Sequence, residues 1–256
     1  RMVSREIIHF MRSRNIEFTG RSLKPYTRIY SFFDNTDITR FCFPKILEIT
    51  MTSGTFQVGE VVIGAMGSAA LNVQAFNDST LPKINARVAV CNHKYGRFDN
   101  PTDTYTSNPY DRSNVIPATY SESSTILNLD TASLADDANV NQGGYIAEDM
   151  LLIGQTSGAQ ATVRQVRLMT DGVGTLIGSF RVPDASNTGN PTFETGRNRF
   201  RLTSSSINSR VSGLFSTAAE QTFFSQGDLD NSEEVTLSLR NAEVTVDTSE
   251  TNPNLT

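Results

Sequence analysis

The feature that most constrains the fold is an internal repeat. Residues 61–73 read VVIGAMGSAALNV and residues 151–163 read LLIGQTSGAQATV, and the two stretches align without a gap. The aromatic and acidic residues that precede the copies are Phe56 with Glu60 and Tyr145 with Glu148. A pattern that returns at a fixed offset indicates a repeated structural unit, the alternative being chance similarity between two hairpins.

Each copy predicts a tight β-hairpin. Gly64 and Gly154 end an apolar run, where we expect the positive φ that glycine adopts freely, and Gly158 lies in the turn that follows. The residues after the turn then alternate between apolar and polar side chains, as strands do. We therefore expect two small SH3-like β-barrel modules, at 52–95 and 142–184.

The rest of the chain also has strand patterns and few helix signals. Apolar residues alternate or run together over short stretches bounded by turn residues, at 16–18, 28–33, 46–51, 198–203, 221–225 and 235–240. Residues 2–11 fit a short helix or a strand, with extended structure favoured. The sequence predicts an all-β chain: a discontinuous Ig-like sandwich from 1–51 and 190–256, with the two barrels inserted, because insertions in surface loops cost little stability.

Residues 96–141 are rich in Asn, Asp, Ser, Thr, Tyr and Pro, which is typical of a loop or an extended arm. Tyrosines punctuate this stretch, and we name Tyr105, Tyr110 and Tyr120 as candidate interface residues, with Tyr95 just before them. A tyrosine buries a large ring and keeps a polar tip, which suits an anchor on a neighbouring subunit. A loop tethered to its own domain is the other interpretation.

Charge is unevenly distributed along the chain. The net charge is -5, which argues against a general nucleic-acid binder, yet the first thirty residues are basic and residues 228–256 carry seven acids against Arg240. One end could dock on the other, within the subunit or across an interface, or both could be solvated faces. Arg12, Arg14 and Arg21 are the candidate interface residues on the basic side.

The search for chemistry gives mostly negative results. Cys42 and Cys91 lie in apolar settings and are expected to be free buried thiols, as in a reducing cytosol. Neither histidine, His9 or His93, has metal-site spacing, and the acidic stretch 228–239 lacks the glycine and final carboxylate of a helix-flanked calcium loop. We expect no enzyme activity, no metal and no cofactor. No apolar run suits a membrane span, no signal peptide is visible, and the start at Arg1 suggests a fragment or a processed product.

Four stretches, 10–18, 23–34, 54–61 and 194–203, resemble segments of large virion structural proteins of tailed phages, most strongly those of T4-like cyanophages. The resemblance implies a tail component associated with the baseplate or fibres, located in the virion and assembled in the host cytoplasm. Its implied partners are other virion structural proteins and further copies of itself, with no nucleic acid and no membrane. The resemblance supplies no catalytic residues. The alternative function is a carbohydrate-binding module that contacts host-surface glycans, and an enzyme such as a cell-wall hydrolase comes third.

Overall fold

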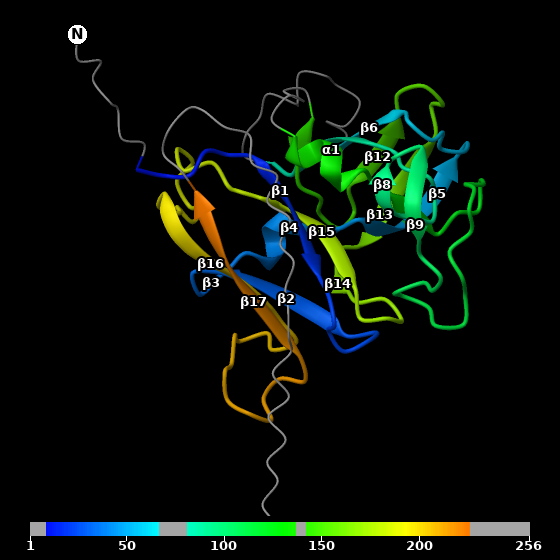
Figure 1. Ribbon diagram of the computed structural model, residues 1–256. Helices are drawn as coiled ribbons and strands as arrows, with labels where there is room; N and C mark the ends of the chain where they lie inside the picture. The colour runs from blue at the N-terminus through cyan, green and yellow to red at the C-terminus, as the bar shows by residue number, and fades with distance from the viewer. Residues whose placement is uncertain (1–8, 67–80, 137–141, 226–256) are drawn as a thin grey trace, which may run out of the picture.

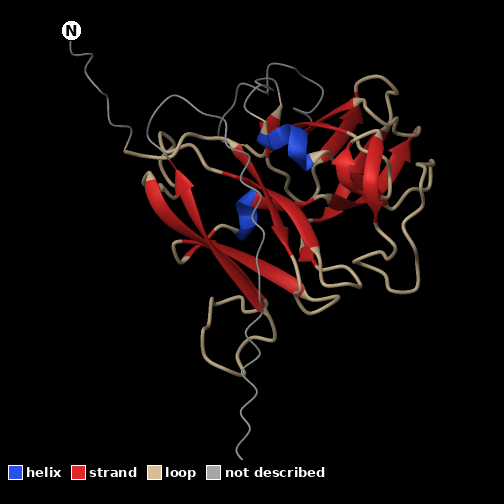
Figure 2. Cartoon of the chain, in the orientation of Figure 1, coloured by secondary structure: helices blue, strands red, loops and turns tan. Residues whose placement is uncertain are grey.

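The chain is nearly all β in the residues that the computed structural model describes, 9–66, 81–136 and 142–225 (Figures 1 and 2). Within these ranges the helical elements are a five-residue helix, α1 (Thr131–Ala135), and a 3-10 turn, η1 (Thr39–Phe41). Everything else is strand, turn or loop. The all-β class that the strand patterns predict is therefore confirmed.

The two ends of the described chain come together in a β-sandwich. One sheet has the order β1–β15–β4, formed by Asn15–Gly20, Leu176–Arg181 and Cys42–Pro44. The other has the order β14–β2–β16–β17, formed by Leu168–Met169, Arg28–Phe33, Gly196–Thr203 and Ala218–Ser225, with β3 (Thr36–Asp37) beside β2. Strand β15, which lies in the predicted second barrel, thus pairs with strands from the start of the chain.

Aromatic rings fill the space between these two sheets. Phe33 of β2 contacts Phe180, Phe193, Phe200 and Phe223, with ring centroids 4.9 to 6.4 Å apart. All five rings are at least 94% buried. Because β2 and β16 alternate, every second side chain of each strand enters this core and the others face outward.

The turn from β2 to β3 shows how local sequence sets this layout. Asp34 and Asn35 have φ of 46° and 67°. Two successive residues of positive φ define the tight hairpin turn that matches strand twist, and Asp and Asn tolerate this conformation better than most residues. Asp34 is thereby held beside the middle of β16, where its carboxylate accepts a hydrogen bond from the backbone N–H of Arg199 at 2.6 Å.

Next to the sandwich, the chain forms a separate seven-stranded sheet that contains strands from both copies of the repeat (Figure 1). Its order is β10 (Ile126–Asn128), β5 (Ile46–Ser53), β13 (Gln160–Gln165), β12 (Leu151–Gly154), β6 (Val61–Ala65), β7 (Lys83–Arg87) and β11 (Gly143–Gly144). The first strands of the two copies, β6 and β12, pair antiparallel with Ile63 opposite Ile153. The first strands of the two copies therefore lie side by side in one sheet, whereas the repeat pattern predicts a separate barrel for each copy. The turn and second strand of the first copy lie outside the described residues.

The three turn glycines have different roles. Gly158 has φ of +69°, as expected for its turn, but Gly64 and Gly154 do not have positive φ. A Cβ on Gly64 would lie 2.6 Å from Leu152 and 2.7 Å from Ile84, and one on Gly154 would lie 2.7 Å from both carboxylate oxygens of Glu60. These two glycines are required by close packing and not, as predicted, by backbone conformation.

The segment 96–136 is folded into the domain. It contains most of the hairpin β8 (His93–Arg97) and β9 (Asn100–Thr104), the strand β10 at the edge of the seven-stranded sheet, and α1. Between β9 and β10, residues 105–125 form a loop without helix or strand, as the polar composition predicts. Side chains such as Asp111 bind the local backbone and hold its tight turns.

No helix in the described ranges is long and apolar enough to span a membrane. The strand predictions at 28–33 and 198–203 match β2 and most of β16, whereas 235–240 lies outside the described residues, as does most of 2–11.

Candidate interaction surface

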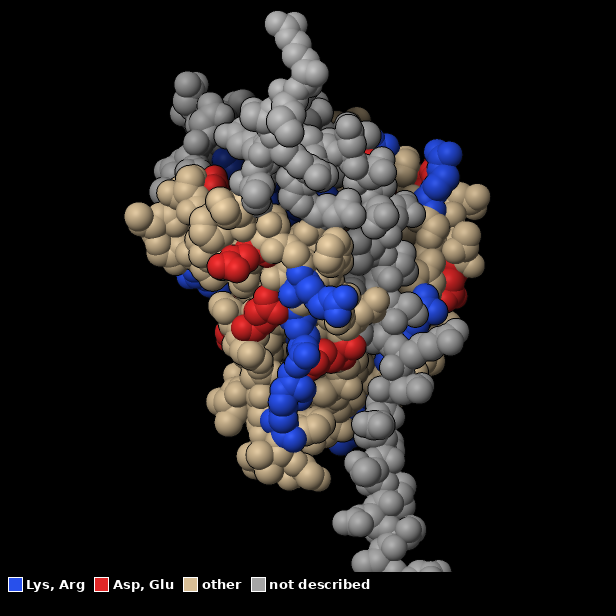
Figure 3. All heavy atoms as spheres, turned by 60° about the vertical axis from the view of Figure 1, so that its left-hand side comes forward, with Lys and Arg blue, Asp and Glu red and all other residues tan. Residues whose placement is uncertain are grey.

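The most exposed candidate site is the solvent-facing side of the β16–β17 hairpin, which we call the hairpin surface. On β16 the residues Asn198, Phe200 and Leu202 are buried, and the intervening arginines belong to the opposite face. The strand register places Arg197 opposite Phe224, Arg199 opposite Thr222 and Arg201 opposite Glu220. Three arginines therefore lie on one face of a single strand. Figure 3 shows Lys and Arg side chains gathered in a stripe on one face of the molecule.

Apolar side chains frame these arginines at both ends. The loop between β16 and β17 projects from the body of the fold (Figure 1) and exposes Ile207 (78%), Val211 (62%) and Leu214 (59%). At the other end of β17, Phe224 is 58% exposed. Apolar groups of this size are normally withdrawn from water, so several on one hairpin indicate a surface that contacts a partner.

The arginines outnumber the acids that neutralise them. Glu220 contacts three guanidinium groups, those of Arg199 (3.0 Å), Arg201 (3.3 Å) and Arg210 (2.7 Å). Arg197 is exposed, and no acid pairs with it among the described residues. Even with Asp34 of the β2–β3 turn beside it, Glu220 leaves two carboxylates against four cations, so the hairpin surface has a net positive charge.

Arg201 shows the consequence of this imbalance. Its side chain is only 7% exposed, and its Nε has no hydrogen-bond acceptor within the described part of the chain. Burial lowers the pKa of its guanidinium, the neighbouring Arg210 lowers it further, and Glu220 opposes both effects. The positive charges of the hairpin surface are therefore only partly compensated by Glu220.

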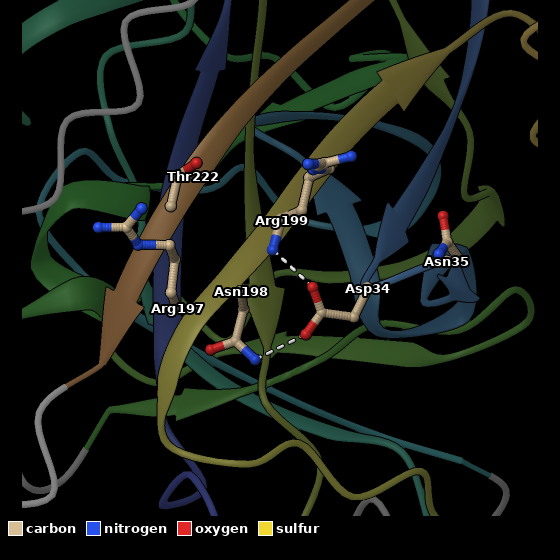
Figure 4. Close-up of a pocket in the computed structure, with 6 residues that line it drawn as sticks. All are labelled: Asp34, Asn35, Arg197, Asn198, Arg199 and Thr222. Carbon is tan, nitrogen blue, oxygen red and sulfur yellow. Dashed lines mark hydrogen bonds between the residues drawn. The ribbon is translucent and has the colours of Figure 1, made fainter.

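A shallow cleft of about 220 Å³ adjoins the arginines where β16 meets the β2–β3 turn (Figure 4). Its lining residues are Asp34, Asn35, Arg197, Asn198, Arg199 and Thr222. Asp34 accepts hydrogen bonds from the Arg199 backbone and from Asn198 Nδ2 (2.7 Å), while the buried Asn198 Oδ1 has no donor. The cleft thus offers a fixed carboxylate beside a guanidinium, Arg197, that points away from it (Figure 4).

The tyrosines proposed as anchors for a neighbour are anchors within the chain. Tyr105 is 5% exposed, the hydroxyl of Tyr110 donates to the Ile46 carbonyl at 2.6 Å, and that of Tyr120 donates to the Ala89 carbonyl at 2.7 Å. Burial raises the pKa of all three phenols. Their rings pack around a small core of Ile46, Ile116 and Ile126, so the tethered-loop interpretation holds.

The predicted basic residues are not gathered in one place. Arg12 and Arg21 are exposed, Arg14 is half-buried, and the guanidinium of Arg21 lies over the Tyr95 ring at 5.1 Å. All seven acids of the proposed docking partner lie outside the described residues. The predicted contact between the two chain ends stays a prediction.

Both cysteines and His93, which are residue types common in catalytic and metal sites, are buried in this fold. Cys42 and Cys91 are free and buried, as expected, and burial raises the pKa of the Cys91 thiol to about 12. His93 is 2% exposed, with Nε2 at 2.9 Å from the Gly96 carbonyl, and burial lowers its pKa. The described residues contain no cluster of metal-ligating side chains, and the acidic stretch 228–239 lies beyond them.

Sequence reasoning missed the hairpin surface although its signal was present. The alternation Arg197-x-Arg199-x-Arg201 within a strand pattern places the three cations on one face. Glu220 and Arg210, in contrast, join them only through strand register and the return of the loop. Neither protein-family models, curated proteins nor solved structures gave a match to this chain.

Proposed function

We propose that the chain is a non-catalytic structural component of a tailed-phage virion, which makes protein–protein contacts in the tail, baseplate or fibre attachment region. The observation that supports this most directly is the hairpin surface. Its arginines and Phe224 are of residue types enriched in protein interfaces, and Ile207 and Leu214 add exposed apolar area beside them. The phage assignment itself rests on the sequence resemblance.

The β1–β15–β4 and β14–β2–β16–β17 sheets fit the Ig-like sandwich that we propose for this component. Both chain ends contribute strands, and both sheets bury their inner faces in one aromatic core. Sandwiches of this kind serve many unrelated functions, so the function depends on the surface and not on the fold.

The carbohydrate-binding alternative depends on four tyrosines, Tyr95, Tyr105, Tyr110 and Tyr120. Tyr95 is partly exposed, and the Arg21 guanidinium lies over its ring at 5.1 Å. Tyr105, Tyr110 and Tyr120 use their rings and hydroxyls inside the fold and cannot form an exposed stacking platform without breaking those contacts. A glycan array with the purified chain tests this alternative, and binding to host polysaccharide would support it.

The structural role is tested on intact particles. An antibody against the chain should label the tail of purified T4-like cyanophage virions in immunogold electron microscopy, and the absence of the chain from particles would overturn the proposal. The contact is tested separately by capturing disassembled virion proteins with the immobilised chain. Leu214→Asp together with Ile207→Asp should abolish capture, whereas Val115→Asp, at a residue 72% exposed elsewhere, should leave it unchanged.

A further inference from the structure

The hairpin surface and the sequence that follows it are electrostatically complementary. β17 ends at Ser225, one residue after Phe224, which lies opposite Arg197. The next thirty-one residues, 226–256, lie outside the described residues and carry seven acids against one arginine. Four of these acids come within nine residues of Ser225: Asp228, Asp230, Glu233 and Glu234.

We propose that the acidic segment 226–256 docks on the hairpin surface of its own chain, with its first acids on Arg197 and its neighbours. This places the basic partner of the acidic end on β16 and not on residues 1–30. The inference does not depend on the proposed virion role, because it concerns only residues of this chain.

Chain length permits the contact. An extended chain covers up to about 3.5 Å per residue, so Asp228 can reach roughly 10 Å from Ser225. Neighbouring strands are only about 5 Å apart, which puts Arg197 well within that reach. A segment tethered at this point has a high effective concentration at the arginines, which favours its own chain over a second copy.

One cation of the hairpin surface is open to an anionic partner. Arg197 is exposed and unpaired within the described structure, whereas Arg201 is buried and contributes its charge to this face without being accessible itself. Two carboxylates stand against the four guanidinium groups, and both are already engaged: Glu220 by three arginines, Asp34 by Asn198 and the Arg199 backbone. Additional carboxylates on this face would therefore meet uncompensated cations and little repulsion.

The chain contains no tryptophan, so one introduced tryptophan gives an unambiguous signal. Phe224→Trp in the full chain places the reporter beside Arg197, at a side chain that is already exposed. If the segment docks there, it shields the indole from acrylamide, a neutral quencher. Replacing Asp228, Asp230, Glu233 and Glu234 by their amides should raise the quenching constant about twofold, as expected when a mostly docked population is released.

Arg197→Glu in the same reporter chain should raise the quenching constant to the same degree, and adding Asp228→Lys and Asp230→Lys to it should restore shielding. High salt should weaken the shielding of the parent chain, because it screens exposed charges. Arg97→Glu is the matched control, since that arginine is 78% exposed on the β8–β9 hairpin. Equal quenching in the parent, amide and Arg197→Glu chains would overturn the proposal, and so would shielding that grows with protein concentration, which would mean docking on a second copy.

Discussion

Two carboxylates in this molecule each collect several donors, with opposite consequences. Glu60 is 5% exposed and accepts four hydrogen bonds, from the backbone N–H groups of Gln57 (2.6 Å), Thr156 (3.0 Å) and Ser157 (2.9 Å) and from the Ser157 hydroxyl (2.8 Å). Glu220 collects three guanidinium groups on the exposed hairpin surface. Three of the four donors to Glu60 are backbone N–H groups, whereas all three partners of Glu220 are long side chains, two of them about half exposed.

This difference means that Glu60 stabilises the fold, whereas Glu220 leaves the hairpin surface available for binding. Glu60 precedes the first copy of the repeat and binds the turn of the second, so it joins the two copies across the β6–β12 pair. Within the described ranges, its counterpart Glu148 accepts one long hydrogen bond, from the Val166 backbone N–H at 3.4 Å. The first strands of the two copies are therefore equivalent in their pairing, but the acids that precede the copies differ in the hydrogen bonds they accept.

The largest effect is expected for Glu60→Gln. The neutral amide is a weaker acceptor, and its NH₂ group faces backbone donors, so buried N–H groups of the 156–157 turn lose their partner. Hydrogen bonds to a charged group contribute about 1.5 to 3 kcal/mol each, so we expect a loss of about 3 kcal/mol in the free energy of unfolding. Urea unfolding measures it, with Glu148→Gln as the matched control; equal losses in the two variants would contradict the asymmetry.

Gly154→Ala tests the same hydrogen bonds of Glu60 by changing a residue that packs against its carboxylate. The new Cβ would lie 2.7 Å from both Glu60 oxygens and 2.6 Å from the Ser157 hydroxyl, so the carboxylate must move out of its hydrogen-bond geometry. Overpacking of this kind costs about 1 to 3 kcal/mol, and we expect about 2 kcal/mol by thermal or urea unfolding. In a Glu60→Gln background the cost should fall because the bonds are already weakened, and full additivity of the two losses would argue against a shared mechanism.

The comparison also shows what sequence can predict. The strand β2 and the turn at Asp34 and Asn35 are local: alternation and turn preference reside in neighbouring residues, and both were recognisable. The pairing of β6 with β12 depends on register between segments ninety positions apart in sequence, which no local pattern encodes. The hydroxyl of Tyr110 donates to the Ile46 carbonyl on β5, a contact between residues distant in sequence. The local sequence around Tyr110 does not encode this contact, and for that reason it suggested an anchor on a neighbouring subunit.

Lowering the pH should reduce the free energy of unfolding through the buried side chain of His93. Its pKa is lowered by burial, and Lys45 nearby adds to the effect, so the folded chain takes up a proton less readily than the unfolded chain. The stability contribution is complete above the unfolded pKa of about 6.5 and is lost as the pH falls through that value, by less than about 1.4 kcal/mol per pH unit. Urea unfolding between about pH 7.5 and 5 measures this slope, and His93→Gln, which retains a donor toward the Gly96 carbonyl, should flatten it. An identical slope in both chains would exclude His93 as the cause.

Glu220→Gln is expected to have the smallest effect on stability, although this carboxylate contacts three guanidinium groups. Its side chain is 27% exposed, and two of its three partners, Arg199 and Arg210, are about half exposed. Exposed ion pairs contribute about 0.2 to 1 kcal/mol, because water already solvates both partners and ordering long side chains costs entropy. We expect a loss near 0.5 kcal/mol, which added salt should reduce. The same substitution removes the main carboxylate from the hairpin surface, so it should strengthen rather than weaken the binding of an acidic segment there. A stability loss as large as that of Glu60→Gln would mean that the arginines hold the fold together and are not available for binding.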